Sequence, residues 1–391
     1  MNIINSTGYE LYNPSVIQAR ECTITDIQGR NFYDFEAGVW ALPLGHNHPR
    51  INKAIINQLS CISHVGYRYS HPVVEEAAEA LLKIMNLPNG KCVFLSSGSE
   101  AVEYAIKAVH KTMNRPYFLK LDKHYLSAYG LSGDLISERW ISIDWQSYIE
   151  KAGDNNNNQC YNELLDMIPF DKINAFVFEP GNTSGTAKLP PKELITAIVS
   201  RVKAYDGYVI VDEVTTGMGR TGRWFGYEHY DIQPDVIACG KGLGNGYPIS
   251  AVGFRKEIAA FVENANFLYA QSHQNDPLGC AVAKEVIEVI KEEKLLEKST
   301  EQGEYLRAEL MKLSAKHPCI LEVRGVGLLC AMELTEEYRD KLNHLHRLLY
   351  ERGFMVGVKP IAKVMRFYPP LNIRKTVIDQ MIAALDEVLS L

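Results

Sequence analysis

Two short apolar runs between residues 208 and 250 constrain the fold of this chain more than any other feature. Residues 208–211 (Tyr-Val-Ile-Val) are followed directly by Asp212, and residues 235–239 (Asp-Val-Ile-Ala-Cys) are followed by Gly-Lys241. Short β-branched runs bounded by glycine, proline and charge are typical of buried parallel strands. Ligands bind beyond the carboxyl ends of such strands in open α/β sheets. The pattern therefore predicts that Asp212 and Lys241 are site residues.

Two further runs end in polar residues that we expect at the same edge of the sheet. Residues 92–95 lead into Ser-Ser-Gly98-Ser99, and residues 174–178 lead into Glu179. Residues 100–109 then carry apolar side chains at helical spacing. Gly98 and Ser99 would thus lie at a helix N-terminus, where free N–H groups and the helix dipole favour phosphate.

A phosphate site, an acid and a lysine at one sheet edge are what pyridoxal 5'-phosphate requires, because this cofactor is held by its phosphate, its ring nitrogen and a Schiff base. Asp212 would keep the ring nitrogen protonated. Lys241 would form the Schiff base and, once released by substrate, move a proton between the substrate carbon and the cofactor. An amine does so only where burial or a nearby cation lowers its pKa.

Two alternative interpretations have less support in the sequence. Residues 217–222 match the G-x-G-x-x-G pattern of dinucleotide-binding folds. Such a fold needs a helix directly after the glycines and an acid about 20 residues further on, but here no helical pattern follows and the carboxylates precede the glycines. His46 and His48 have no cysteine or carboxylate close in sequence, so a structural turn is expected there and no metal site.

The chain resembles the class III aminotransferases, the fold-type I pyridoxal-phosphate family that includes acetylornithine, ornithine and 4-aminobutyrate aminotransferases. The resemblance covers nearly the whole chain and rests on ordered motifs at residues 26–34, 45–49, 97–101, 211–214, 217–222, 240–241, 246–248 and 323–327. It implies an α/β fold with a mostly parallel seven-stranded sheet flanked by helices, and a small α+β domain formed from both termini.

We expect the large cofactor-binding domain to span residues 46–284 and the small domain to combine residues 1–45 with 285–391. Within the small domain, residues 320–323 are predicted to be extended. Thr376 with Asp379 predicts an N-terminal cap for the last helix.

The resemblance also implies roles for single residues. Lys241 would be the Schiff-base lysine and Asp212 the partner of the ring nitrogen, with Arg366 binding a substrate carboxylate through its guanidinium. Ser272 would reach the phosphate of a neighbouring subunit, so a homodimer with its site at the interface is expected. Trp40 either lines the substrate cleft or fills the core. The remaining cofactor contacts are expected from Gly98, Ser99, His124, Tyr125, Glu179, Val214 and Thr215.

Three positions depart from the family pattern. Either His124 or Tyr125 could stack on the cofactor where relatives carry another aromatic residue. Thr215 is shorter than the usual glutamine, which puts its contact with the ring hydroxyl in doubt. Ser184 replaces the glutamate that often pairs with the arginine, which would leave Arg366 available for a carboxylate.

The predicted activity is transfer of an amino group from an amino acid or amine donor to a 2-oxo acid through Lys241. A racemase, epimerase or aminomutase of the same family is the alternative. The identity of donor and acceptor and the pathway depend on loop geometry that sequence does not specify.

Composition sets the remaining expectations. A net charge of −6 without basic runs predicts no nucleic-acid partner. No apolar stretch is long enough for a membrane span, and no signal peptide is apparent. Eight scattered cysteines are typical of reduced thiols, so we expect a cytoplasmic enzyme.

Overall fold

The computed structural model describes residues 2, 4, 11–13, 15–134, 136–152, 158–181 and 186–391. A seven-stranded sheet in the order β4-β10-β9-β8-β7-β5-β6 is its largest layer. Its strands are β4 (Lys91–Leu95), β5 (Tyr117–Leu121), β6 (Trp140–Ile143), β7 (Ile173–Phe178), β8 (Tyr208–Asp212), β9 (Val236–Cys239) and β10 (Ser250–Phe254). Strands β9, β8, β7, β5 and β6 run parallel, and β10 is antiparallel to both of its neighbours. The prediction of a mostly parallel seven-stranded sheet is confirmed.

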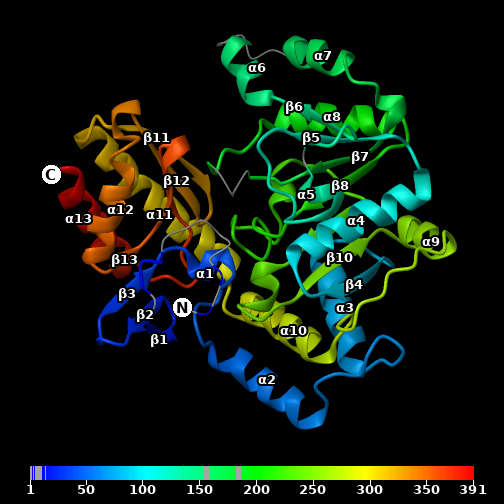
Figure 1. Cartoon of the computed structure of the whole chain (residues 1–391), viewed down its shortest axis with the longest axis horizontal. Coiled ribbons are helices and arrows are strands. Elements are labelled where there is room, and N and C mark those ends of the chain that lie inside the picture. Colours follow the sequence, from blue (N-terminus) through cyan, green and yellow to red (C-terminus); the bar gives the residue numbers. More distant parts are fainter. Residues whose placement is uncertain are drawn as a thin grey trace.

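Helices cover both faces of this sheet (Figure 1). The strands are apolar at almost every position because both faces are buried. In β7, for example, Phe176 and Phe178 belong to one core, whereas Ala175 and Val177 belong to the other. The first core includes α3 (Pro72–Ile84), α8 (Lys192–Ala204) and α10 (Pro277–Glu292), and the second includes α4 (Gly98–Met113) and α9 (Lys256–Asn264). The other helices before residue 170 are α1 (Ala37–Trp40), α2 (Pro49–Cys61), α5 (Gly130–Gly133), α6 (Trp145–Ala152) and α7 (Asn158–Asp166).

Two four-stranded sheets lie beside the large sheet, together with both ends of the chain (Figure 1). One contains β1 (Val16–Arg20), β2 (Thr23–Asp26), β3 (Asn31–Asp34) and β13 (Phe354–Met355); the other contains β11 (Ile320–Val326), β12 (Leu329–Leu334), β14 (Gly357–Lys359) and β15 (Val364–Phe367). β13 pairs in parallel with β3, so one sheet joins the two ends of the sequence. The domain boundaries stay a prediction, and residues 284 and 285 lie within the continuous helix α10.

Three helices cover these smaller sheets: α11 (Leu295–Lys316), α12 (Leu342–Glu351) and α13 (Lys375–Leu389). The predicted cap of the last helix is wrong. α13 begins at Lys375 with Arg374 as its N-cap residue and has no side-chain cap. The carboxylate of Asp379 instead accepts a hydrogen bond from the hydroxyl of Tyr305, which lies on α11.

The parallel strands place four chain segments at one edge of the large sheet. β8 pairs with β9 so that Asp212, its last residue, lies opposite Ala238, and Lys241 opens a 3₁₀ turn two residues beyond β9. β7 ends just before Glu179, and His124 follows β5 by three residues. The carboxyl ends of parallel strands share one edge, so these polar residues are brought to a single site.

Candidate active site

Asp212 and Lys241 form the buried centre of the site. The carboxylate of Asp212 accepts a hydrogen bond from the backbone N–H of Val214 at 3.0 Å. Burial, and then the carboxylate of Glu179, raises the pKa of Asp212 well above its usual range. Burial lowers the pKa of Lys241, although Glu179 and Asp212 oppose that shift. Burial thus favours the protonated, neutral form of Asp212 and the neutral form of the neighbouring Lys241 amine.

Two further contacts fix the side chain of Lys241. Its ammonium donates a hydrogen bond to the hydroxyl of Thr215 at 2.6 Å and lies 4.7 Å from the centre of the Trp40 ring. The backbone of Lys241 has a φ of 41°, in the left-handed region that non-glycine residues rarely occupy. Strained backbone of this kind is concentrated at functional sites, where surrounding structure holds it in place.

The N-terminus of α4 packs against this centre. Ser97 caps the helix by accepting the N–H of Glu100 at 3.2 Å, so Gly98 and Ser99 occupy the first turn as predicted. A Cβ on Gly98 would lie 2.5 Å from Cγ1 of Val214, and one on Gly240 would lie 3.4 Å from Cα of Gly98. Only a residue without a side chain fits between these segments. The first-turn N–H groups lack acceptors within the helix and so offer an anion site close to Lys241.

His124, rather than Tyr125, lies within this group of residues. The His124 side chain is buried at 2% exposure, whereas Tyr125 is 51% exposed. Nδ1 of His124 accepts the backbone N–H of Glu179 at 3.2 Å, which places the ring proton on Nε2. Burial, and then the ammonium of Lys120, lowers the pKa of His124 to about 3, so the ring is neutral. Within the described ranges, the buried Nε2 atom has no hydrogen-bond partner.

The substrate side of the site contains an acid that the sequence did not single out. The guanidinium of Arg366 lies 5.0 Å from the centre of the Trp40 ring, on which Lys241 also lies. Nη2 of Arg366 is 3.5 Å from Oε2 of Glu36. The only sequence signal for this contact is Gly357, because a Cβ there would collide with the Glu36 carboxylate. Ser184, which was expected to leave Arg366 available for a carboxylate, lies outside the described residues.

Ser272 occupies an exposed position in the loop that precedes α10. Within the part of this single chain that the structure describes, Ser272 makes no hydrogen bond to the residues around Lys241. The contact across a subunit interface therefore stays a prediction.

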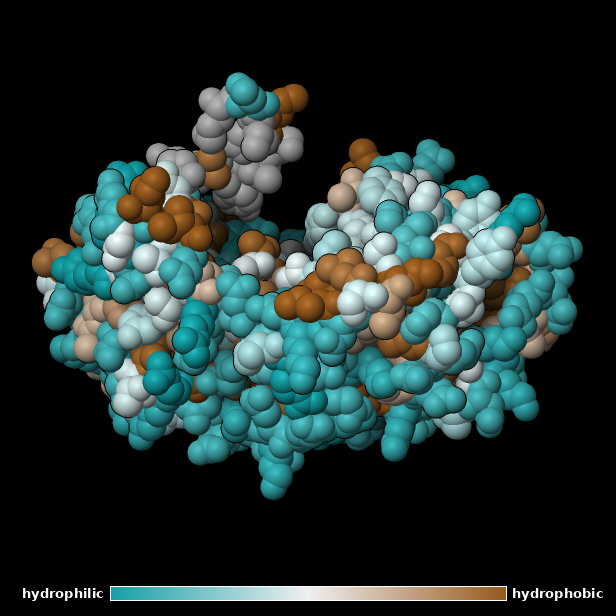
Figure 2. Space-filling view, turned by 90° about the horizontal axis from the view of Figure 1, so that it is seen from below, coloured by the Kyte–Doolittle hydropathy of each residue, from teal (hydrophilic) through white to brown (hydrophobic). Residues whose placement is uncertain are grey.

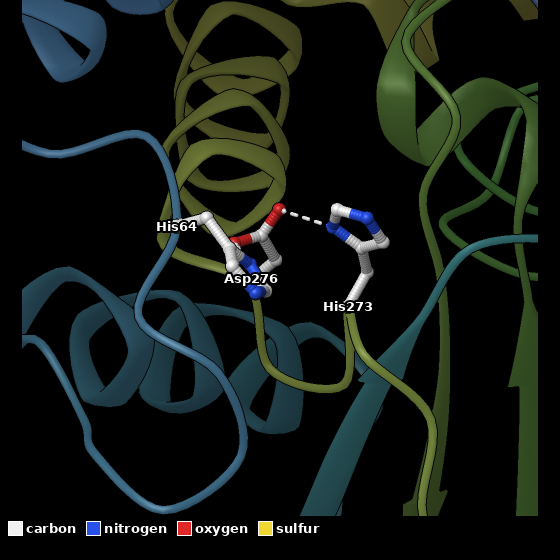
Figure 3. A group of neighbouring side chains, drawn as sticks. All are labelled: His64, His273 and Asp276. Atoms are coloured by element: carbon white, nitrogen blue, oxygen red, sulfur yellow. Dashed lines mark hydrogen bonds and ion pairs between the residues drawn. The ribbon is translucent and has the colours of Figure 1, made fainter.

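A separate side-chain group lies close to Ser272 along the chain. Asp276 contacts two imidazole rings (Figure 3), with 3.0 Å from Oδ1 to Nδ1 of His64 and 3.2 Å from Oδ2 to Nδ1 of His273. Their ligand atoms lie within 4.8 Å of one another, a spacing that a metal ion could use. The sequence gives no local signal for this group, because His64 and Asp276 are far apart in the chain. Nε2 of His46, a histidine for which a structural turn was predicted, lies 2.9 Å from Oδ2 of Asp34.

Comparisons with known proteins agree with this fold and site. The model of the aminotransferase class-III family matches residues 6–389. The chain is 30% identical over 382 residues to the acetylornithine aminotransferase of Methanocaldococcus jannaschii, covering 95% of this chain and 92% of that protein. It is 29% identical over 399 residues to the alanine/serine racemase of Pyrococcus horikoshii, covering 94% of this chain and 83% of that protein. An aminotransferase of Bacillus anthracis superposes with a TM-score of 0.89 at 25% identity, covering 98% of this chain and 95% of that one.

The fold and the site thus define a pyridoxal-phosphate enzyme of fold type I. Within that class, the chain belongs to the class III aminotransferase family. It is a transaminase that depends on pyridoxal 5'-phosphate.

The side chains at the sheet edge fit this cofactor. The N-terminus of α4 offers N–H groups to a phosphate, and Gly98 leaves space for close approach. Asp212 is a buried acid whose pKa is raised, and a cationic ring nitrogen beside it would stabilise its ionised form. The buried, neutral ring of His124 offers a face to an aromatic cofactor, and the amine of Lys241 suits its aldehyde. When bound, the cofactor supplies an electrophilic carbon for amines and a ring that withdraws electrons from the substrate carbon.

Proposed function

We propose that Lys241 binds the cofactor covalently and carries the proton of the amino transfer, while Asp212 holds the protonated ring nitrogen. One observation supports this assignment above the others. The Lys241 ammonium lies 2.6 Å from the Thr215 hydroxyl and 4.7 Å from the Trp40 ring centre, beside the buried Asp212. Burial lowers the pKa of Lys241, and an amine with a lowered pKa can serve as nucleophile and base near neutral pH.

The remaining cofactor contacts follow from the same packing. We assign the phosphate to the N–H groups of Gly98 and Ser99, and the two ring faces to Val214 and His124. The burial of His124 supports it over Tyr125. Glu179 and Thr215 contact His124 and Lys241 respectively, and so hold these two side chains in place.

Replacement of the lysine tests the assignment. Lys241→Ala should abolish turnover, and after borohydride reduction the mass of the protein should show no attached cofactor. Lys256→Ala removes an exposed lysine at the start of α9 and should retain both the activity and the reduced adduct. An adduct that persists in Lys241→Ala would contradict the proposal.

We propose an amino acid or amine as donor and a 2-oxo acid as acceptor, with Arg366 binding a substrate carboxylate. Support comes from the position of Arg366, because its guanidinium and the ammonium of Lys241 both lie over the Trp40 ring. The visible absorption band of the holoenzyme should disappear when the right donor is added without acceptor, and a 2-oxo acid should restore it. No change with any donor would contradict the amino-transfer half reaction.

Racemisation is a second candidate activity, favoured by the similarity to the alanine/serine racemase of Pyrococcus horikoshii. In a racemase the base returns the proton to the same carbon, so no 2-oxo acid is formed. Chiral chromatography of a single amino-acid enantiomer incubated without acceptor distinguishes the two activities. Conversion to the other enantiomer with an unchanged absorption band would favour racemisation.

A homodimer is the proposed assembly, with Ser272 reaching the partner's phosphate. Hydrophobic side chains are exposed in a band on the side of the molecule seen in Figure 2. Other exposed large side chains lie on α2, in the loop after α2, in the segment between β5 and α5, and in the loop before α10; they are Leu59, Tyr67, Tyr69, Tyr125, Tyr129 and Leu268. Light scattering should give twice the monomer mass. A monomer that is fully active would contradict an interface site.

A cytoplasmic location is proposed on the basis of the cysteines, because Cys22, Cys61 and the other cysteines described are free thiols. None of the helices in the described ranges is long and apolar enough to cross a membrane.

A further inference from the structure

Two imidazole rings meet one carboxylate in the group formed by His64, His273 and Asp276 (Figure 3). Nδ1 of His64 lies 3.0 Å from one carboxylate oxygen of Asp276, and Nδ1 of His273 lies 3.2 Å from the other. The centres of the two rings are 4.7 Å apart, with an angle of 50° between the ring planes. Both rings thus direct the same nitrogen atom toward one acid.

The fold holds the segments that carry these side chains close together. His64 follows the end of α2 by three residues. The turn that carries His273 and Asp276 is joined to β4 by two hydrogen bonds of 2.9 Å between Asn275 and Phe94. The tertiary structure therefore brings His64 to Asp276, although the two residues are 212 positions apart in the chain.

The carboxylate of Asp276 is available to a cation. Asp276 is the N-cap residue of α10, where an acidic side chain usually accepts an N–H of the first turn, yet it makes no such bond. Among the described residues, its ion-pair contacts are with His64 and His273, and none is with a lysine or an arginine. An imidazole carries a charge only when it is protonated, so no permanent cation neutralises this carboxylate.

The group is open to water and has space for further ligands. The side chains of His64 and His273 are 39% and 61% exposed, whereas that of Asp276 is 13% exposed. His273 and Asp276 also line a cavity of about 290 Å³, together with Tyr247 and Gly279. The exposed rings can therefore rotate with little loss of packing, and water molecules can reach an ion held between them.

We propose that His64, His273 and Asp276 bind one divalent transition-metal ion, expected to be Zn²⁺. Two nitrogen ligands and one oxygen ligand suit zinc, whereas Ca²⁺ and Mg²⁺ prefer oxygen ligands alone. Zn²⁺ lies about 2.0–2.2 Å from such atoms, which places tetrahedral ligand atoms about 3.3–3.6 Å apart. The contacts of 3.0 and 3.2 Å are close to that spacing, and the three ligand atoms lie within 4.8 Å of one another. A small rotation of the exposed rings completes the site, with the ring protons on Nε2 and water as the fourth ligand.

The ion would connect the segment after α2 with the turn before α10. The same turn carries Ser272, the neighbour of His273, so the ion would also restrict the backbone of the residue proposed to reach the partner's phosphate. The metal site does not rest on the proposed amino transfer, because none of its three residues is assigned to the cofactor or to the substrate.

The test measures Zn²⁺ binding to the intact holoenzyme by calorimetry after dialysis against EDTA, with bound metal counted by elemental analysis. The wild type should bind one Zn²⁺ per chain that the variants lose. His64→Ala and His273→Ala should each weaken this binding by at least about 100-fold, since loss of a residue that only orients a ligand already costs about 10–100-fold. Asp276→Asn keeps the shape of the side chain without its charge and should weaken binding by at least about tenfold.

His344→Ala is the matched control, because this histidine is exposed on α12 and belongs to a different part of the fold. It should bind Zn²⁺ like the wild type. Zinc should also raise the unfolding temperature of the wild type and of His344→Ala, but not that of His64→Ala. Absence of bound Zn²⁺ in the wild type would overturn the proposal and leave the group as a set of hydrogen bonds. Wild-type affinity in both His64→Ala and His273→Ala would overturn it as well.

Discussion

Glu36 lies against Arg366 from the opposite end of the chain, with 3.5 Å between Oε2 and Nη2. The acid follows β3, and the arginine belongs to β15. Gly357, opposite Arg366 in β14, leaves the space that the Glu36 carboxylate occupies. Under the proposed function, a substrate carboxylate must therefore compete with Glu36 for the guanidinium.

Removal of the competing charge should favour carboxylate substrates. In Glu36→Gln, we expect the KM for a 2-oxo acid at pH 8 to fall by about 2- to 10-fold, since a partly exposed ion pair contributes about 0.5–1.4 kcal/mol. The kcat should change little, because Glu36 does not touch Lys241. Steady-state kinetics with pyruvate and 2-oxoglutarate check this. A raised KM would instead mean that Glu36 positions Arg366 for its substrate.

The same pair predicts a pH dependence of substrate binding. Burial raises the pKa of Glu36 to about 7, although Arg366 opposes the shift. Above about pH 7 Glu36 is ionised and competes for Arg366; below it the acid is neutral and competes less. The KM for a 2-oxo acid should therefore rise between pH 6 and pH 8, by at most about tenfold per pH unit for one proton. Glu36→Gln should flatten this part of the KM profile, and a persistent slope would assign it to another group.

The sequence predicted the centre of the site far better than this pair. Asp212 and Lys241 each follow an apolar run, and adjacent parallel strands bring such ends together without knowledge of distant contacts. The Glu36–Arg366 contact depends on β13 pairing with β3 and β14 with β15. No local periodicity specifies a pairing between segments more than 300 residues apart, so the acid was missed.

A buried acid next to Asp212 supports the loop that follows β8. Oε2 of Glu213 accepts hydrogen bonds from the Thr216 hydroxyl at 2.6 Å and the N–H of Gly226 at 2.8 Å, and Oε1 accepts the N–H of Tyr227 at 2.7 Å. Glu213→Ala would leave these buried donors unsatisfied, so the free energy of unfolding should fall by about 2–4 kcal/mol. Urea denaturation of the apoenzyme measures the loss. Glu257→Ala, an exposed acid on α9, should change it by less than about 0.5 kcal/mol.

Relief of backbone strain next to Trp40 should raise the free energy of unfolding. The four residues of α1 have left-handed φ angles of 44° for Ala37, 59° for Gly38, 61° for Val39 and 70° for Trp40. A β-branched residue is unfavourable there by about 1–2 kcal/mol, and the Val39 side chain is 62% exposed, so little packing would be lost. Val39→Gly should therefore raise the free energy of unfolding by up to about 1 kcal/mol after the entropy of the unfolded chain is included. Val39→Ala keeps a Cβ and should give a smaller gain; equal gains would rule out strain as the cause.

Strands were easier to predict from the sequence than the ends of helices. Apolar runs such as residues 174–178 are buried on both faces, so composition alone identifies them. Thr376 and Asp379 matched a capping pattern, yet the side chain of Asp379 is engaged by Tyr305 on another helix, and α13 begins at Lys375. Tertiary contacts thus decide which polar side chains cap a helix.

His124 and Tyr125 were equivalent candidates in the sequence, and burial separates them. If the neutral His124 ring stacks on the cofactor, His124→Ala should weaken cofactor binding by about 5- to 30-fold, as expected for loss of about 1–2 kcal/mol of aromatic contact. His124→Phe keeps the aromatic face and should recover most of the affinity. Titration of the apoenzyme with pyridoxal 5'-phosphate, followed by absorption, measures each dissociation constant. Tyr125→Ala should bind like the wild type, because its side chain is half exposed. Weakening by Tyr125→Ala with no effect of His124→Ala would reverse the assignment and move the stacking contact to Tyr125.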